Sequence, residues 1–349
     1  MRSSYSENDV VILLKDITGM IEPQSTEERE KLIQSGKHYC EMLPLEYVPT
    51  EQYMNVYKQS LAAFSKTVAN AVAVLSEKII KRKGNDVVLV SLARAGIPIG
   101  ILIKHYITWK YKINIPHYSI SIIRGKGIDK NAMKYILARY DAKKIQFVDG
   151  WIGKGTILEE LKKALADYND VSSELAVISD PINITELCGT HEDILIPSSC
   201  LNSIVSGLIS RTVLRDDLIG RNDFHGAVFY ENLRDSDLSY SFINSIENEF
   251  SNIVKDDFVP QDGNGRNEVI NIATHFGVSD INLIKPGIGE TTRVLLRRFP
   301  WKIIVDKKYI NSPQLNHLLK LAEEKKVSLE VYPLKHYKCC GIIKKMADA

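Results

Sequence analysis

Apolar residues recur at helical spacing in the first quarter of the chain. Between Tyr53 and Ile80 they lie mostly three or four positions apart, which predicts one long helix with an apolar face. The basic residues Lys81–Lys83 and the following Gly84 predict its C-terminus, where cations and glycine are favoured. We therefore predict that residues 1–85 form a mostly helical region packed on the rest of the chain.

Beyond residue 85, short β-branched runs alternate with helical patterns. Strands separated by helices form parallel βαβ crossovers, so the alternation predicts an α/β fold with a doubly wound parallel sheet. Ligands bind such sheets beyond the carboxyl ends of the strands. The predicted strands cover residues 87–90, 118–123, 145–148 and 175–178, and the predicted helices cover residues 98–106, 130–138 and 156–168.

A smaller α/β pattern follows a change in composition. Pro, Gly and Asn cluster at residues 260–265, which predicts a linker. We place the domain boundary there, with a central domain over residues 86–260 and a C-terminal domain over residues 261–349. In the C-terminal domain, strands are predicted at residues 281–284, 302–305 and 327–331, and helices at residues 289–298 and 312–325.

Composition indicates the number of domains and argues against a membrane or secreted protein. The chain has 349 residues, 44% of them hydrophobic, which is ample for two or three globular domains. No apolar run reaches the roughly 18 residues that span a bilayer, and the first residues lack the apolar segment of a signal peptide. These features predict a cytoplasmic protein without a membrane partner.

The cysteines give no sign of a disulfide framework. There are five, Cys40, Cys188, Cys200, Cys339 and Cys340, and no two have the CxxC spacing of a zinc site. Reduced thiols with mainly structural roles are expected.

The segment after the predicted strand 145–148 carries the strongest chemical signal. Asp149 ends the apolar run, and a glycine-spaced loop leads into the predicted helix from Thr156. Backbone N–H groups and a helix N-terminus that face one point favour a phosphate. Asp149 would bind ribose hydroxyls beside it, or alternatively would cap the helix. The predicted substrate-binding residues of this loop are Gly150, Gly153, Lys154, Gly155 and Thr156.

Two further loops leave the same predicted sheet edge. Arg94, in a tight turn with Ala95 and Gly96, is predicted to contact a pyrophosphate. Arg124 and Lys126, interleaved with glycines, are predicted to form a cationic flap that closes over a polyanion. Each loop alone is equally well explained as a turn or a solvated surface. Together they favour a site for ribose, phosphate and pyrophosphate.

At these residues the chain resembles the type I phosphoribosyltransferases. Their motif is an apolar run, two acidic residues and a Thr/Gly loop before a helix, and here Gly150 replaces the second acid. The resemblance implies a type I phosphoribosyltransferase-like sheet. It also implies a glycosyltransferase that makes or breaks the C1 glycosidic bond of a phosphoribosyl pyrophosphate-like (PRPP-like) substrate. Asp149, Arg124 and Lys126 would be catalytic. No protein metal ligands are implied, because Mg²⁺ would be held through the oxygens of the ligand.

Longer strings resemble a narrower group, the phosphoribosyltransferase-like proteins of bacterial tellurium-resistance gene clusters, also called the cysteine protease StiP family. That name implies an alternative, a protease with Cys200 as nucleophile and His225 as its partner. Otherwise Asn202 and Arg211 would bind an anion or a base edge, or their segment would only pack over the sheet. The matching strings include residues 35–39, 120–129, 148–151, 196–203, 206–212 and 224–227.

The C-terminal domain resembles the Pelota and ribosomal kink-turn-binding superfamily. The string Gly287–Arg293 carries this resemblance, although Gly289 stands where the family has Asn. It implies a small α/β/α sandwich that binds RNA at the start of a helix. Charge agrees, since residues 284–349 hold 14 basic and 6 acidic residues while the whole chain has a net charge of +2. The implied RNA contacts are Gly289, Glu290, Thr292, Arg293 and Arg297.

The sequence therefore predicts a phosphoribosyltransferase-type enzyme with a fused RNA-binding-like domain. Its predicted partners are a small ribose-phosphate substrate and RNA, and a homodimer is left open. Two alternatives remain at this point, a non-catalytic ribonucleotide sensor that acts on RNA and a cysteine protease that uses Cys200. A C-terminal dimerisation or lid domain without RNA is also open.

Overall fold

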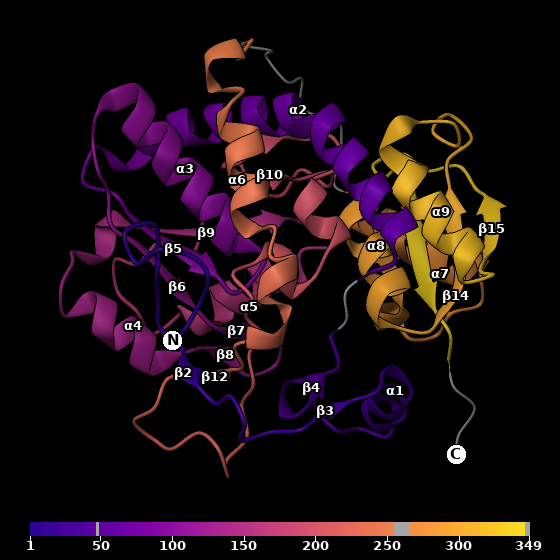
Figure 1. Ribbon diagram of the computed structural model, residues 1–349, viewed down its shortest axis with the longest axis horizontal. Coiled ribbons are helices and arrows are strands. Elements are labelled where there is room, and N and C mark those ends of the chain that lie inside the picture. The colour runs from indigo at the N-terminus through magenta and orange to yellow at the C-terminus, as the bar shows by residue number, and fades with distance from the viewer. Residues whose placement is uncertain (47–48, 255–264, 346–349) are drawn as a thin grey trace.

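The computed structural model describes residues 1–46, 49–254 and 265–345. Within this part of the chain, a large α/β domain lies beside a smaller one at the C-terminus, coloured yellow in Figure 1. The predicted boundary at residues 260 and 261 and most of the predicted linker lie outside the described residues. The three-part domain division therefore stays a prediction.

The large domain is built on a parallel sheet, as the alternating pattern predicted. Its described strands run in the order β1 (Val11–Ile12), β6 (His117–Ile120), β5 (Val88–Leu92), β9 (Ile145–Trp151), β10 (Leu175–Ser179) and β11 (Cys188–Thr190). Every pairing among them is parallel. The α/β class with a parallel sheet is confirmed.

Helices cover both faces of this sheet. The long helix α2 (Glu51–Lys83), α3 (Gly96–Tyr111) and α6 (Ser239–Glu247) share one apolar core. On the opposite face, α4 (Lys130–Leu137) and α5 (Thr156–Ala164) pack in a second core. The predicted helix between Tyr53 and Ile80 is thus part of α2, and Gly84 follows its last residue as expected.

The N-terminal region is less helical than predicted. It contains α1 (Thr26–Gln34), the paired strands β3 (Pro23–Gln24) and β4 (Leu43–Pro44), and β1 at the edge of the main sheet. The strand β2 (Lys15–Asp16) pairs with β12 (Gly226–Ala227). These strands are two residues long, and pairing partners distant in sequence define them, so no local periodicity reveals them.

The strand β11 was also missed, because its sequence Cys-Gly-Thr lacks a β-branched run. Its glycine is required by packing. A Cβ on Gly189 would lie 2.4 Å from the carbonyl oxygen of Ala71 in α2. A short hairpin, β7 (Ile122–Ile123) and β8 (Gly127–Ile128), follows β6 where one longer strand was predicted.

The C-terminal domain is a mixed sheet between helices. Its strand order is β13 (Ile284–Pro286), β16 (Cys339–Ile343), β14 (Pro300–Val305) and β15 (Ser328–Val331), and only β14 and β15 pair in parallel. The helices α8 (Ile288–Arg297) and α9 (Asn316–Glu324) join the first core, and α7 (Arg266–His275) joins the second. Both cores therefore continue from one domain into the other.

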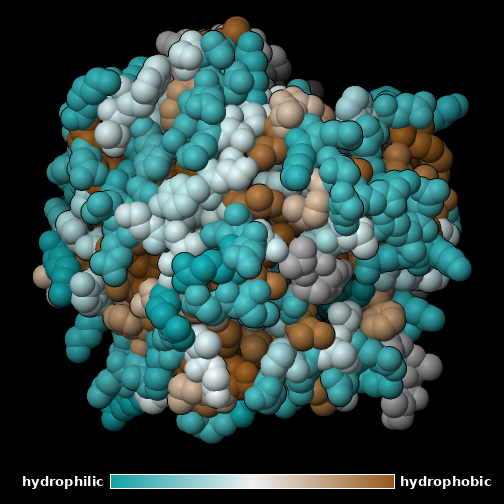
Figure 2. All heavy atoms as spheres, in the orientation of Figure 1, coloured by the Kyte–Doolittle hydropathy of each residue, from teal (hydrophilic) through white to brown (hydrophobic). Residues whose placement is uncertain are grey.

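The outer surface is ordinary for a globular protein. Figure 2 shows a face on which hydrophilic residues dominate and hydrophobic ones are scattered between them. Within the described residues, no helix has both the length and the apolar composition needed to cross a membrane.

Candidate functional site

A cavity of about 600 Å³ lies where the two domains meet. Strand order in the sheet changes direction between β5 and β9, and ligands of doubly wound sheets bind at such switch points. The two strands and their loops approach closely, since a Cβ on Gly96 would lie 2.4 Å from the carbonyl oxygen of Val148. The glycine is thus needed for packing at the cavity base.

The loop after β9 forms one wall of the cavity, although Gly150, which was also predicted to bind substrate, does not line it. Asp149, Gly153, Lys154, Gly155 and Thr156 all line the cavity, and Gly155 caps α5 with a positive φ of 85°. Burial raises the pKa of Asp149 to about 6, while a hydrogen bond from the Gly150 N–H and the charge of Arg293 oppose this. The predicted role of this loop in ribose-phosphate binding stays a prediction.

The ammonium group of Lys154 is held by backbone of the other domain. Its Nζ donates to the carbonyl oxygens of Ile281 and Ile284, at 2.5 and 3.2 Å. Burial lowers its pKa to about 8, and the nearby charges of Lys285 and Arg124 lower it further. Backbone carbonyl groups therefore hold the Lys154 ammonium close to other positive charges that repel it.

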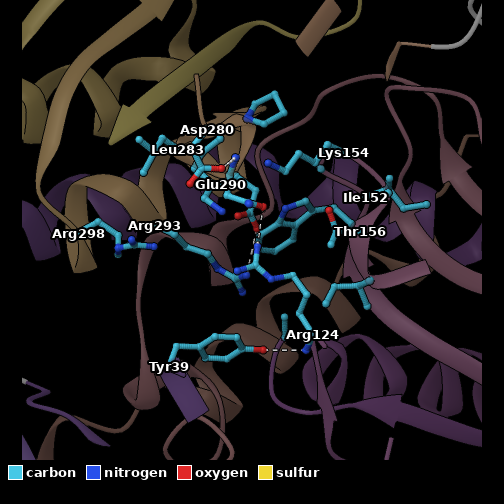
Figure 3. A pocket seen from close by; sticks show the side chains of 18 of the residues that line it. Tyr39, Arg124, Ile152, Lys154, Thr156, Asp280, Leu283, Glu290, Arg293 and Arg298 are labelled. Carbon is cyan, nitrogen blue, oxygen red and sulfur yellow. Dashed lines mark hydrogen bonds and ion pairs between the residues drawn. The ribbon is translucent and has the colours of Figure 1, made fainter. Parts of the chain in front are cut away.

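The opposite wall is the helix α8. Glu290 and Arg293 both line the cavity and pair with each other at 3.3 Å (Figure 3). Arg293 lies over the ring of Trp151 at 4.4 Å, and a Cβ on Gly289 would lie 2.4 Å from that ring. Sequence reasoning assigned these α8 residues to RNA. The structure instead turns them toward the central domain.

Several other predicted site residues are engaged by protein groups. Asn202 accepts a hydrogen bond from Arg297, and the buried Thr292 is bonded to His317. The buried guanidinium of Arg94 pairs with Glu46 at 2.9 Å and donates to the carbonyl oxygen of Ile209 at 2.6 Å. Arg94 is thus part of an internal ion pair that no local pattern could predict, while its neighbour Ala95 and the distant Arg211 line the cavity.

The predicted cationic flap is fixed in this structure. The N–H groups of Gly125 and Gly127 donate to the two carboxylate oxygens of Glu160, at 2.8 and 2.9 Å. Arg124 lines the cavity, and its N–H donates to the hydroxyl of Tyr39 (Figure 3). Lys126 does not line the cavity but lies near Cys40, where its charge counteracts the rise in the thiol pKa.

The predicted pair Cys200–His225 does not form. The ring of His225 is bonded to Ser121 at 2.9 Å, and its backbone N–H donates to Asp129. Cys200 is fully buried beside Tyr53, and burial raises the pKa of its thiol to about 12. A thiol in that setting is inert.

Two other cysteines do contact histidines. The Sγ of Cys188 lies 3.4 Å from Nε2 of His191, and burial raises the pKa of this thiol to about 12. The Sγ of Cys40 lies 2.9 Å from Nδ1 of His38, whose Nε2 is 3.0 Å from the carbonyl oxygen of Arg124. All five cysteines are free and buried.

The Cys40–His38 contact adjoins the cavity, because Tyr39 and Arg124 both line it. His38 is the N-cap of a short 3₁₀ turn, Tyr39–Glu41, and this turn folds its ring back onto Cys40. Sequence reasoning missed this pair. Its only signal was a His and a Cys two positions apart, which gives no geometry without the turn.

No cluster of three or more His, Cys, Asp or Glu side chains suited to a metal ion occurs in the described part of the chain. The magnesium expected with a PRPP-like ligand stays a prediction.

A buried carboxylate ties the two domains together near the cavity. Asp193 accepts hydrogen bonds from the N–H groups of Ile288 and Lys338, at 3.0 and 2.9 Å. It thereby caps the start of α8 from the other domain. Burial raises the pKa of Asp193 to about 6 from its ordinary value of 3.8, and these hydrogen bonds only partly oppose the rise.

We expect Asp193→Asn to change how stability depends on pH. A carboxyl whose pKa is higher in the folded state loses stabilising free energy as pH rises from about 4 to 6. Relative to the Asn variant, the native chain should therefore lose about 2–3 kcal/mol across that range and stay level above pH 7. Urea unfolding at several pH values measures this, with Asp235→Asn as an exposed control. An unchanged difference between pH 4 and 7 would contradict the prediction.

Comparison with known proteins identifies relatives of both parts of the chain. Residues 3–247 match the family described as "Tellurite-like stress resistance cysteine protease StiP", and residues 263–345 match the "PELOTA RNA binding domain". The protein named "Cysteine protease StiP" of Acinetobacter baylyi (strain ATCC 33305 / BD413 / ADP1) is 35% identical over 341 residues, which cover 92% of this chain and 88% of that protein.

These matches correct the predicted activity. The family and the relative are both named as cysteine proteases, which contradicts the prediction of a phosphoribosyltransferase, a glycosyltransferase or a PRPP-dependent transferase. The motif around Asp149 misled because a glycine-rich strand-to-helix loop predicts an anion site and does not specify a reaction. The predicted Pelota domain and StiP relationship are confirmed.

Proposed function

We propose, from the fact that this chain belongs to the StiP family of tellurite-like stress resistance cysteine proteases, that it is a thiol-dependent peptidase. Cys40 is the nucleophile and His38 is the general base. The distance of 2.9 Å between Cys40 Sγ and His38 Nδ1 supports this assignment most directly. Nucleophile and base within hydrogen-bond reach are the arrangement that such catalysis requires.

The hydrogen bonds of His38 select the tautomer needed. If Nε2 carries the proton, it donates to the carbonyl oxygen of Arg124, and Nδ1 is left with a lone pair toward Cys40. The Cys40 thiol gives its proton to Nδ1, and the thiolate attacks the peptide carbonyl carbon. The amine leaves with the proton from His38, and water then hydrolyses the thioester.

The surroundings distinguish Cys40 from the competing pair. Burial and the charge of Glu41 raise the pKa of the Cys40 thiol, and the ammonium of Lys126 opposes that rise. Burial raises the pKa of the Cys188 thiol to about 12 even though the ammonium of Lys78 opposes it. None of the four residues lines the cavity, but Tyr39, which lies between His38 and Cys40, does, whereas Cys188 and His191 are both buried. His38 is only partly buried, so its pair lies closer to solvent.

Access to Cys40 requires a local movement. The residue is only 1% exposed, and its Sγ also lies 3.7 Å from the carbonyl oxygen of Leu214. The Arg124–Gly127 segment covers it through the contacts with His38 and Tyr39. A peptide in the cavity reaches the thiol when this segment shifts away from Glu160.

Covalent labelling tests the assignment. A peptidyl epoxysuccinate, which alkylates activated thiols, should modify Cys40 first in the folded chain, as located by peptide mapping. Loss of this labelling at Cys40 in His38→Ala, with the fold retained, would agree with a base role. Preferential labelling of Cys188 would replace our pair with Cys188–His191, and labelling of neither would refute a peptidase at either site.

RNA binding is a second candidate function, supported by the Pelota match over residues 263–345. The start of α8 faces the central domain, so the exposed lysines around Asp306 are the surface we propose for RNA phosphates. Lys308 and Leu334 donate their N–H groups to the Asp306 carboxylate, which places exposed Lys307, Lys308 and Lys335 near one another. Such cations bind RNA backbone in a salt-dependent manner.

We expect the double variant Lys308→Gln, Lys335→Gln to bind single-stranded RNA several-fold more weakly than the native chain. The slope of log affinity against log salt should fall by about one to two, because up to two phosphate contacts are lost. Fluorescence anisotropy across a salt series measures both quantities, and Lys58→Gln, exposed on α2, is the control. Equal slopes for all three proteins would exclude this surface.

A further inference from the structure

Arg29, on α1, is buried without adequate hydrogen bonds. The residue is only 2% exposed, and Nε and Nη2 of its guanidinium have no hydrogen-bond partner. An unpaired charge buried in this way costs several kcal/mol. A buried charge without hydrogen-bond partners therefore indicates a residue that binds a ligand.

The carboxylates near Arg29 are already engaged by other arginines. Both oxygens of Glu30 accept hydrogen bonds from Arg298, at 2.6 and 2.9 Å. Glu46 pairs with Arg94 and also accepts two hydrogen bonds from Ser203. The charges of Glu30 and Glu46 raise the pKa of Arg29, but neither carboxylate accepts a hydrogen bond from its Nε or Nη2.

Arg211 adds another cation on the cavity side. Its guanidinium stacks on Tyr39 at 4.8 Å. Burial lowers its pKa to about 10, and the charge of Arg29 contributes to this shift. Burial lowers the pKa of Arg29, and the charge of Arg298 lowers it further. The three guanidinium groups thus lie close enough to repel one another.

We infer that Arg29, Arg211 and Arg298 form a binding site for a small multivalent phosphate. Arg211 and Arg298 line the cavity, and Arg29 is adjacent in sequence to Glu30, the carboxylate that pairs with Arg298. Arginine donors match phosphate oxygens in geometry and charge. A bound oxyanion supplies acceptors for Arg29 Nε and Nη2 and relieves the repulsion.

The wider cavity favours a multivalent ligand over a single small anion. Its charged lining comprises seven cations and three carboxylates, for a formal charge of +4. A cavity of about 600 Å³ accommodates either a free inorganic polyphosphate or the phosphates of a nucleotide. The cations in the lining are Arg124, Lys154, Arg211, Lys285, Arg293, Arg298 and Lys345, and the carboxylates are Asp149, Asp280 and Glu290.

Titration calorimetry with the full chain tests the site, with pyrophosphate, tripolyphosphate and ATP as separate probes. We expect tripolyphosphate to bind at micromolar concentration, with Arg29→Gln at least tenfold weaker and Arg221→Gln unchanged. Arg221 is exposed and does not line the cavity. Tighter binding of ATP than of tripolyphosphate identifies the ligand as a nucleotide, and the reverse identifies an inorganic polyphosphate.

Stability provides a second readout that a purely structural arginine would not give. Without ligand, Arg29→Met should melt about 2–4 °C higher than the native chain, because it removes an unpaired buried charge. With tripolyphosphate, only the native chain should gain further stability. A lower melting temperature for Arg29→Met without ligand, or equal tripolyphosphate affinity in both proteins, would overturn the inference. Neither result depends on Cys40, so this site and the peptidase can fail separately.

Discussion

Cys40→Ser lowers the rate of peptide cleavage by about 10³-fold or more, because the serine hydroxyl is a far weaker nucleophile than a thiolate. His38→Ala produces a loss of similar size, since the thiol at 2.9 Å then has no acceptor for its proton. The double variant is no worse than either single one, because the two residues act as a unit. Cleavage of an unstructured fluorescent peptide measures all three.

The other buried thiols provide matched controls for this loss. Cys200→Ala and Cys188→Ser each remove a buried thiol that we place outside the reaction. Both should retain cleavage within a factor of about three once their folded fractions are equalised. Full activity in Cys40→Ser would refute the assignment outright. Loss in Cys188→Ser alone would transfer it to the pair with His191.

Arg94→Gln destabilises the chain by about 3–5 kcal/mol, because it leaves the Glu46 carboxylate buried without its partner. The side chains of Arg94 and Glu46 are 6% and 2% exposed, and the pair is 2.9 Å apart. Adding Glu46→Gln to Arg94→Gln removes the unpaired charge and should recover at least half of that loss. Equilibrium unfolding in urea measures both variants.

This outcome also separates a structural arginine from a ligand-binding one. The sequence places Arg94 in a turn suited to pyrophosphate. A ligand-binding arginine would give a variant of native stability with weaker anion affinity. If Arg94→Gln unfolds at the native urea concentration, the ion pair contributes little and the sequence-based interpretation regains support.

Local patterns were sufficient for the elements that hold the site. Apolar runs predicted the strands β5, β6 and β9, although these end at Leu92, Ile120 and Trp151 and not at residues 90, 123 and 148 as predicted. Glycine spacing predicted the loop before Thr156. These signals depend on residues close in sequence. They correctly placed Asp149, Lys154 and Thr156 beside one cavity, although they gave no information about the reaction.

The parts of the site that local patterns did not predict depend on contacts between segments distant in sequence. The second wall comes from α8, more than 130 residues after the Asp149 loop, and only domain packing brings Glu290 to Gly153. The partner of Arg94 lies 48 positions earlier. The contact between Cys40 and His38 is local, but it depends on a 3₁₀ turn that propensity does not specify.

The two apolar cores that pass from one domain into the other limit how the molecule can move. Swinging the C-terminal domain away would separate α9 from α2 and α8 from the turn Pro197–Cys200, and would expose the apolar residues packed there. That exposure costs about 25 cal/mol for each Å² of apolar surface wetted. A hinge-like opening is therefore disfavoured, and molecules entering the cleft depend on small rearrangements of loops and side chains at its rim.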